Sequence, residues 1–120
     1  MNKSKVLSLL TLFSIGTCLA EENIDGKWNC EMVSDYGESV FSLTLNKEMT
    51  FKKKQDMFGK IHVGIGKWHV DGKTLIMNRE TYIKDGVEKA SSQEFKREIT
   101  SSSDTKLVLQ HGSTVTSCTK

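Results

Sequence analysis

Short runs in which hydrophobic and polar residues alternate make up most of this chain. Phe41, Leu43 and Leu45 are separated by single polar residues, so an extended backbone would place all three on one face. The same alternation recurs over residues 61–65, where two isoleucines and a valine would share a face, and over residues 75–77. This pattern is typical of half-buried antiparallel strands, and we expect each hydrophobic face to point into a core.

Turn-forming residues separate the alternating runs. The pairs Asp71-Gly72 and Asp85-Gly86 suit tight hairpins, because the central positions of such turns require positive φ. The intervening segments predict eight strands, at residues 26–34, 39–46, 48–55, 60–70, 73–84, 87–99, 105–111 and 113–119.

The connections between these strands are all short, so the simplest topology is an antiparallel meander. A meander whose first and last strands are neighbours closes into a barrel and leaves no exposed edge. The sequence therefore predicts an all-β protein, with one small antiparallel barrel of about eight strands. A sandwich of two sheets is the alternative, since it would use the same alternation.

The first twenty residues differ from the rest of the chain. Lys3 and Lys5 are followed by an apolar segment at residues 6–15 and by small residues up to Ala20. This order is typical of a secretory signal peptide, which predicts a leader at residues 1–20 and a barrel domain at residues 21–120 in the periplasm or outside the cell. The alternative is a lipoprotein signal, in which Cys18 would carry an outer-membrane lipid anchor. No later segment is apolar enough for a transmembrane helix.

Removal of this leader changes the charge of the protein. The whole chain has 17 Lys and Arg against 15 Asp and Glu, and loss of Lys3 and Lys5 leaves 15 against 15. A neutral domain gives no electrostatic argument for binding nucleic acid. About 100 residues make one small domain with limited capacity to bury surface, and we expect a monomer.

Two of the three cysteines, Cys30 and Cys118, remain after removal of the leader. In an exported protein such a pair predicts a disulfide, and neither cysteine has the spacing of a metal site. Because Cys30 is near the start of the domain and Cys118 near its end, the bond would hold the first and last strands together.

The motif Gly-Lys-Trp occurs twice, ending at Trp28 and at Trp68. Trp28 shares a face with Cys30, and Trp68 shares one with Val70, so both indoles are expected to point inward. Glycine close to a large ring allows a strand to bend or another segment to approach, as at Gly64 and Gly66. We therefore interpret the two tryptophans as residues that close the barrel.

The two Gly-Lys-Trp motifs, together with residues 46–51 and 66–75, resemble the small bacterial lipocalin-like proteins, which belong to the calycin type. Those proteins have Gly-x-Trp on the first strand, a polar turn before a Thr-Phe strand, and a second Gly-x-Trp ahead of a Gly-x-x-Leu hairpin. The resemblance implies a barrel plugged by Trp28, with an arginine near the last strand packed over that ring. This chain departs from the pattern, because its final arginine is Arg97.

Several polar residues are candidates for binding chemistry. Lys52 and Lys54 flank a third lysine and are candidate anion contacts, although solvated lysines on a strand are the simpler interpretation. His62, His69 and His111 would form a metal site only if their strands were adjacent. His62 and His69 alternate with apolar residues, so we expect solvent-facing histidines and predict no metal site. The methionines, among them Met77, are expected to fill the core.

No catalytic signature is present, and neither an enzyme nor a cofactor is predicted. The favoured function is that of an exported binding protein of the bacterial envelope, whose barrel accommodates a small apolar or lipid-like ligand. Trp28, Trp68, Phe41 and Met77 are the residues expected to close the barrel or line its interior. The alternative is a rigid barrel that binds a protein partner, such as an inhibitor of lysozyme or another envelope enzyme, with the loop at residues 34–38 as the candidate contact.

Overall fold

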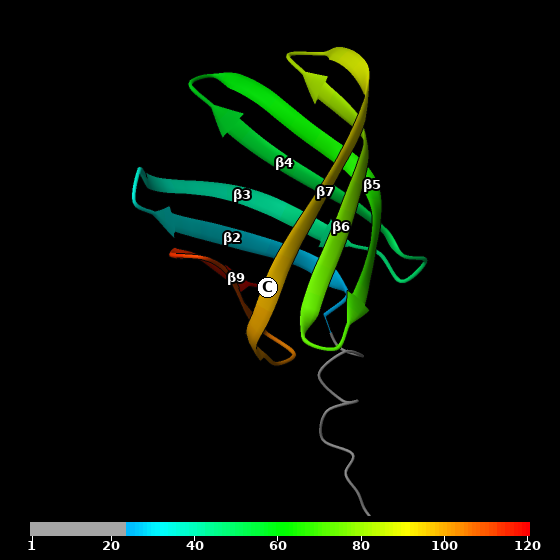
Figure 1. Ribbon diagram of the computed structural model, residues 1–120. Coiled ribbons are helices and arrows are strands. Elements are labelled where there is room, and N and C mark those ends of the chain that lie inside the picture. Colours follow the sequence, from blue (N-terminus) through cyan, green and yellow to red (C-terminus); the bar gives the residue numbers. More distant parts are fainter. Residues whose placement is uncertain (1–23) are drawn as a thin grey trace, which may run out of the picture.

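The computed structural model describes residues 24–120, and every regular element in this part of the chain is a β-strand (Figure 1). The predicted signal peptide and Cys18 lie outside the described residues. The strands are β2 (Gly26–Ser34), β3 (Gly37–Leu45), β4 (Thr50–Met57), β5 (Lys60–Asp71), β6 (Thr74–Lys84), β7 (Val87–Ser102), β8 (Lys106–His111) and β9 (Thr114–Thr119). No helix within residues 24–120 has the length and hydropathy needed to cross a membrane.

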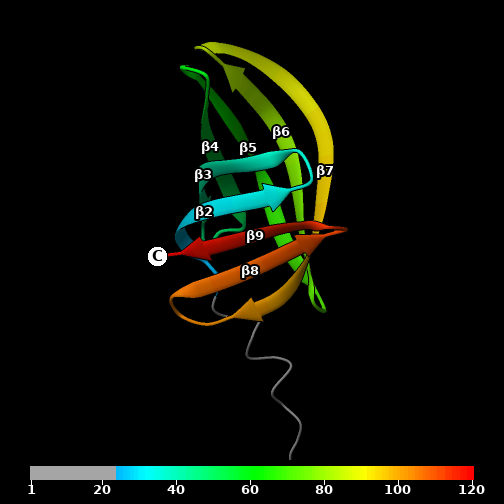
Figure 2. The same cartoon turned by 90° about the vertical axis from the view of Figure 1, so that its left-hand side faces the viewer.

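The eight strands form one closed barrel. Each strand pairs antiparallel with the next, and β2 pairs with β9 to complete the ring. Figure 2 shows β3, β2, β9 and β8 side by side on one wall. The predicted all-β meander barrel is therefore confirmed, and the sandwich alternative is wrong. The predicted strand bounds are close, with the largest change at the end of β7 and smaller ones at the start of β3 and at both ends of β4.

The barrel is closed at a disulfide. Cys30 on β2 lies directly opposite Cys118 on β9, and their sulfur atoms are 2.04 Å apart. The predicted pairing is confirmed. The bond joins residues 88 positions apart, and in the chain-entropy model a loop of this length restricts the unfolded state by about 4 to 5 kcal/mol. A disulfide also indicates an oxidising compartment.

One end of the barrel is filled by a hydrophobic core around Trp28. The Trp28 side chain is fully buried, and its indole Nε1 donates a hydrogen bond to the carbonyl oxygen of Ile24 at 2.9 Å. The ammonium nitrogen of Lys120 lies 4.7 Å from the centre of a Trp28 ring and donates to the carbonyl oxygen of Asp25. Lys120 thus supplies the cation that the lipocalin resemblance assigned to an arginine.

The second Gly-Lys-Trp also lies at the closed end. Trp68 is 5% exposed, and its Nε1 donates to the carbonyl oxygen of Asn46 at 3.0 Å. A Cβ atom on Gly66 would come within 1.9 Å of the carbonyl oxygen of Asn78, so only glycine allows β5 and β6 to approach this closely. The β5–β6 register shifts between Ile65 and Gly66. The unpaired residue is Glu80 on β6, so the expected close approach at the glycine is present while β5 itself has no inserted residue.

The residues of β5 that point into the barrel are not the ones that the sequence predicted. Ile61 and Ile65 are exposed on the outer surface, whereas His62 and Gly64 line the interior. The prediction that the apolar residues of 61–65 point inward is therefore wrong, as is the prediction that His62 faces solvent. The reason is continuity: the inward direction of Trp68 determines the faces of all even-numbered residues along this uninterrupted strand.

The turns opposite the closed end are tight hairpins. Asp85 and Gly86 have φ values of 52° and 82°, which confirms the expected left-handed conformation at both positions. Phe58 and Gly59 also have positive φ values, of 57° and 83°. At the β5–β6 turn, which lies at the closed end, Gly72 has a positive φ and Asp71 does not, so the expectation of positive φ at both positions is wrong there.

Candidate functional site

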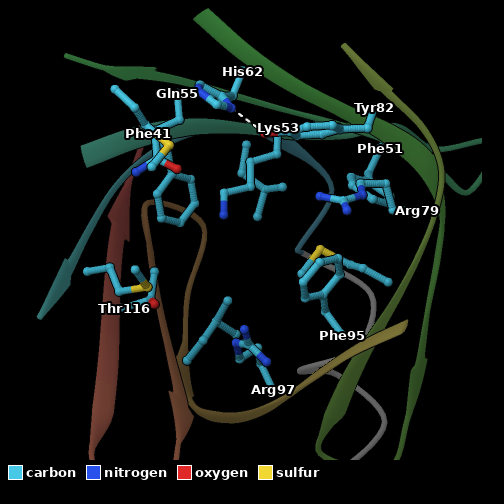
Figure 3. A pocket seen from close by; sticks show the side chains of 16 residues that line it. Phe41, Phe51, Lys53, Gln55, His62, Arg79, Tyr82, Phe95, Arg97 and Thr116 are labelled. Atoms are coloured by element: carbon cyan, nitrogen blue, oxygen red, sulfur yellow. Dashed lines mark hydrogen bonds between the residues drawn. The ribbon is translucent and has the colours of Figure 1, made fainter. Parts of the chain in front are cut away.

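An interior cavity of about 160 Å³ lies between the closed end and the β2–β3, β4–β5 and β6–β7 turns (Figure 3). All eight strands contribute to its wall, because each presents every second side chain to the interior. The lining residues are Met32, Phe41, Leu43, Phe51, Lys53, Gln55, Met57, His62, Gly64, Met77, Arg79, Tyr82, Phe95, Arg97, Leu109 and Thr116. We call this space the barrel cavity.

Most of the cavity wall is apolar. Aromatic rings and thioethers dominate it, since Phe41, Phe51 and Phe95 are joined there by three methionines and two leucines. Flexible thioethers adapt their shape to an apolar occupant. The wall therefore suits a ligand with an apolar body.

Three cationic side chains also reach the cavity. Figure 3 shows Lys53 from β4, Arg79 from β6 and Arg97 from β7 directed toward the same central space. No carboxylate is among the residues that line it. Both ion pairs found within residues 24–120, Lys67 with Glu80 and Lys96 with Glu94, join exposed side chains. The barrel cavity is thus apolar in its wall and positively charged.

The charge of Lys53 is disfavoured in this position. Burial is the largest cause that lowers the pKa of its ammonium group, followed by repulsion from Arg97 and then from Arg79. Burial also lowers the pKa of Arg97 from its usual value. The Lys53 nitrogen lies 4.4 Å from the centre of the Phe41 ring, a contact that offsets part of this cost.

Arg79 is held in place by neutral partners. Its Nε donates to Ser91 Oγ at 3.0 Å, and one terminal nitrogen donates to Gln93 Oε1 at 2.8 Å. The guanidinium carbon lies 4.4 Å from the centre of the Tyr82 ring. These contacts orient the guanidinium group without neutralising its charge.

Gly64 provides room for Arg79. A Cβ atom at residue 64 would lie 3.0 Å from Cδ of Arg79, which is tighter than ordinary van der Waals contact. An inward-pointing side chain at this position would therefore displace the arginine.

His62 and Tyr82 form a polar pair at the cavity wall. Nδ1 of His62 shares a hydrogen bond with the hydroxyl of Tyr82, and the two rings are 5.7 Å apart between centres. Because the imidazole tautomer decides which group donates, the pair can present either a donor or an acceptor pattern to a bound molecule. Within residues 24–120, no group of three His, Cys, Asp or Glu side chains is arranged to hold a metal ion.

The structure separates the residues that the sequence grouped as a candidate site. Phe41 and Met77 line the barrel cavity, whereas Trp28 and Trp68 belong to the core at the closed end. Lys52 and Lys54 are exposed on the outside, and the lysine that enters the cavity is Lys53 between them. Anion contact by Lys52 and Lys54 stays a prediction.

Sequence reasoning missed the cations and the polar pair of the cavity. A usable signal was present on β4, because Phe51 is buried and the residues at 53, 55 and 57 follow it on the same face. For Arg79 and Tyr82 no such signal exists. They differ by an odd number of residues and both line the cavity because a bulge lies between them.

The wall of the barrel opens between β3 and β4. Their pairing runs from Leu45 opposite Phe51 to Ser42 opposite Lys54 and ends there. A surface depression of about 470 Å³ lies at the separation and includes Val40, Phe41 and Ile61. Since Phe41 also lines the barrel cavity, this opening is adjacent to the interior.

Comparison with known proteins identifies the architecture. No protein-family model matches the sequence, and no curated protein matches it. Among solved structures, the chain is similar to the crystal structure of a lipocalin-like protein from Bacteroides uniformis ATCC 8492. The two are 14% identical with a TM-score of 0.62, over 82% of this chain and 98% of that chain. The fold of this protein is therefore lipocalin-like.

Proposed function

We propose that this protein is an exported, non-catalytic binding protein of the bacterial envelope, and that its barrel holds a small apolar or lipid-like ligand. The observation that carries the proposal is the barrel cavity, whose mostly apolar wall is built from all eight strands. Concave, largely apolar sites with a few polar groups are the usual form of small-molecule binding sites.

The size of the cavity limits the ligand. Typical pockets for drug-sized molecules measure roughly 300 to 1,000 Å³, so 160 Å³ admits a smaller body. An apolar cavity of about 150 Å³ accepts benzene. The proposal is accordingly a ligand of that order, not a long acyl chain held entirely inside.

Export is supported by two independent features. Residues 1–20 have the order of a signal peptide, and the Cys30–Cys118 disulfide fits an oxidising compartment. The functional form would be a monomer of residues 21–120, periplasmic or secreted. Lipidation of Cys18, which would anchor the protein to the outer membrane, is the alternative form of export.

A second candidate function is recognition of an envelope protein. Tyr36, at the tip of the β2–β3 hairpin and within the loop at residues 34–38, is fully exposed. Phe58, at the tip of the β4–β5 hairpin, is fully exposed as well. Exposed aromatic side chains are frequent anchors of protein interfaces, and this is the specific observation in favour of a partner.

Native mass spectrometry of the protein purified gently from its own envelope, without reductant, distinguishes these functions. The expected spectrum contains a non-covalently bound small molecule. Met32→Trp, which adds volume at the cavity wall, should release it, while the adjacent outward variant Val33→Trp should retain it. If the original protein and the Val33→Trp variant both lack a bound molecule, the cavity function is contradicted and a protein partner is favoured.

A further inference from the structure

We propose that the ligand of the barrel cavity carries one anionic group, a carboxylate or a phosphate, held among Lys53, Arg79 and Arg97. Its apolar body would have roughly six carbon atoms, in proportion to a cavity of this volume. The inference rests on the proposed function and names the chemical class of its ligand.

The cations of the barrel cavity have no opposite charge among the residues that line it. Lys53, Arg79 and Arg97 reach one small cavity, and none of the residues that line it is acidic. Charged groups withdrawn from water are costly unless an opposite charge compensates them. The three positive charges therefore lack a compensating negative charge, and a bound anion would supply one.

The position of Arg79 is fixed by its neighbours in the cavity wall. Ser91 and Gln93 hold Arg79 through two hydrogen bonds, and Gly64 leaves the space that its side chain occupies. Neither partner is charged. Because a guanidinium group has further donors in one plane, it can bind both oxygens of a carboxylate or phosphate.

Cation–π contacts are a rival explanation for the presence of these cations. Lys53 lies over Phe41, and Arg79 lies over Tyr82. Such contacts attract a cation but bring no negative charge, so the repulsion of Lys53 by Arg97 and Arg79 persists. A ligand that has both an anionic head and an apolar body would relieve this repulsion and fill the space beside the rings.

The test uses isothermal titration calorimetry on the protein purified after expression of its full-length precursor. Hexanoate, hexyl phosphate and 1-hexanol share a chain of six carbons and differ in the head group. We expect at least one of the two anions to bind about tenfold or more tightly than the neutral alcohol, as befits charge-assisted hydrogen bonds. The ratio between the two anions then distinguishes a carboxylate from a phosphate ligand.

Variants locate the head group. Lys53→Met and Arg97→Met should each lower the preference for the anion about tenfold, and leave the affinity for 1-hexanol close to that of the original protein. Lys52→Met is the matched control, because this neighbouring lysine is exposed on the outer face of the same strand. It should retain the full preference, and thermal melting of each variant verifies that the barrel is folded.

Each outcome decides between the two proposals. Equal affinity for hexanoate, hexyl phosphate and 1-hexanol overturns the anionic ligand and leaves the cavity function standing. A preference that is lost in Lys52→Met but kept in Lys53→Met places the anion outside the barrel and also overturns the inference. Absence of binding by all three probes up to millimolar concentration overturns the cavity function itself.

Discussion

Gly64 on β5 lies against the side chain of Arg79 on β6, and a Cβ atom at residue 64 would be 3.0 Å from the arginine Cδ. The absence of a side chain at one residue thus leaves space at the cavity wall for the half-buried side chain of another. The position of a cationic group in the barrel cavity therefore depends on a glycine in the neighbouring strand.

The Gly64→Ala substitution should leave the protein folded but impair anion binding. The added methyl group must push the flexible Arg79 side chain away from Ser91 and Gln93, so we expect the preference for hexanoate over 1-hexanol to fall several-fold. Calorimetry measures this change. Unaltered preference in a folded variant would show that the position of Arg79 does not matter for binding.

Gly66→Ala provides the contrasting case on the same strand. Its Cβ atom would be 1.9 Å from the carbonyl oxygen of Asn78, which belongs to the backbone and cannot rotate away. We expect a loss of about 3 kcal/mol or more in the free energy of unfolding, at the upper end of overpacking effects. Denaturant titration of the two glycine variants therefore separates a functional glycine from a structural one.

The Trp28→Ala substitution tests the closed end of the barrel. Trp28 is fully buried and its indole nitrogen is hydrogen-bonded to Ile24, so removal of the ring should lower the free energy of unfolding by about 3 to 5 kcal/mol. Urea denaturation measures this loss. A loss below about 1 kcal/mol would contradict the assigned packing of the ring.

The closed end could be predicted from sequence because its signals are strong and local. Trp28 and Cys30 share a face, and the only two cysteines after the predicted leader lie opposite each other in the β2–β9 ladder. Turn residues with positive φ, such as Gly86, mark the hairpins. These features depend on large apolar side chains and on backbone geometry, both of which are visible along the chain.

The barrel cavity could not be predicted in the same way. Hydrophobicity alone assigned Ile61 and Ile65 to the interior, whereas the structure has His62 and Gly64 there. Extending the inward face from Trp68 along β5, and from Phe51 along β4, would have found His62 and Lys53. The register shift between Arg79 and Thr81 has no such local signal, because it arises from the pairing of distant strands.

Lys53 should make the folded protein less stable at neutral pH than at alkaline pH. Its pKa in the folded state is lowered from the usual 10.5, by burial and by Arg97 and Arg79, so the unfolded chain binds the proton more strongly. Stability must then rise as the pH increases through the folded pKa toward 10.5. At neutral pH, Lys53→Met should unfold at a higher urea concentration than the original protein.

The stability gained by Lys53→Met should diminish as the pH rises toward and beyond 10.5, since the original lysine is already neutral in the folded state and then loses its proton in the unfolded state as well. Lys52→Met, at an exposed position, should show little gain at any pH. A Lys53→Met protein that is less stable than the original at neutral pH would contradict the electrostatic cost assigned to this lysine.

Phe58 is a residue whose conformation is unfavourable for its type. It has a φ of 57° at the tip of the β4–β5 hairpin, and its side chain is fully exposed, so packing does not compensate the backbone. Phe58→Asn should raise the free energy of unfolding by about 1 kcal/mol, because asparagine tolerates the left-handed region. A stability equal to that of Phe58→Ala would contradict this explanation.

The central claim, that the barrel interior is a binding site, is tested most directly by NMR of methionine methyl groups labelled with ¹³C during a hexanoate titration. Met32, Met57 and Met77 line the barrel cavity, while Met49 lies outside it and is half exposed in the β3–β4 turn. A binding site in the interior predicts saturable shifts for the three cavity methyl groups and none for Met49. Shifts confined to Met49, or no shifts in any methyl group, would contradict it.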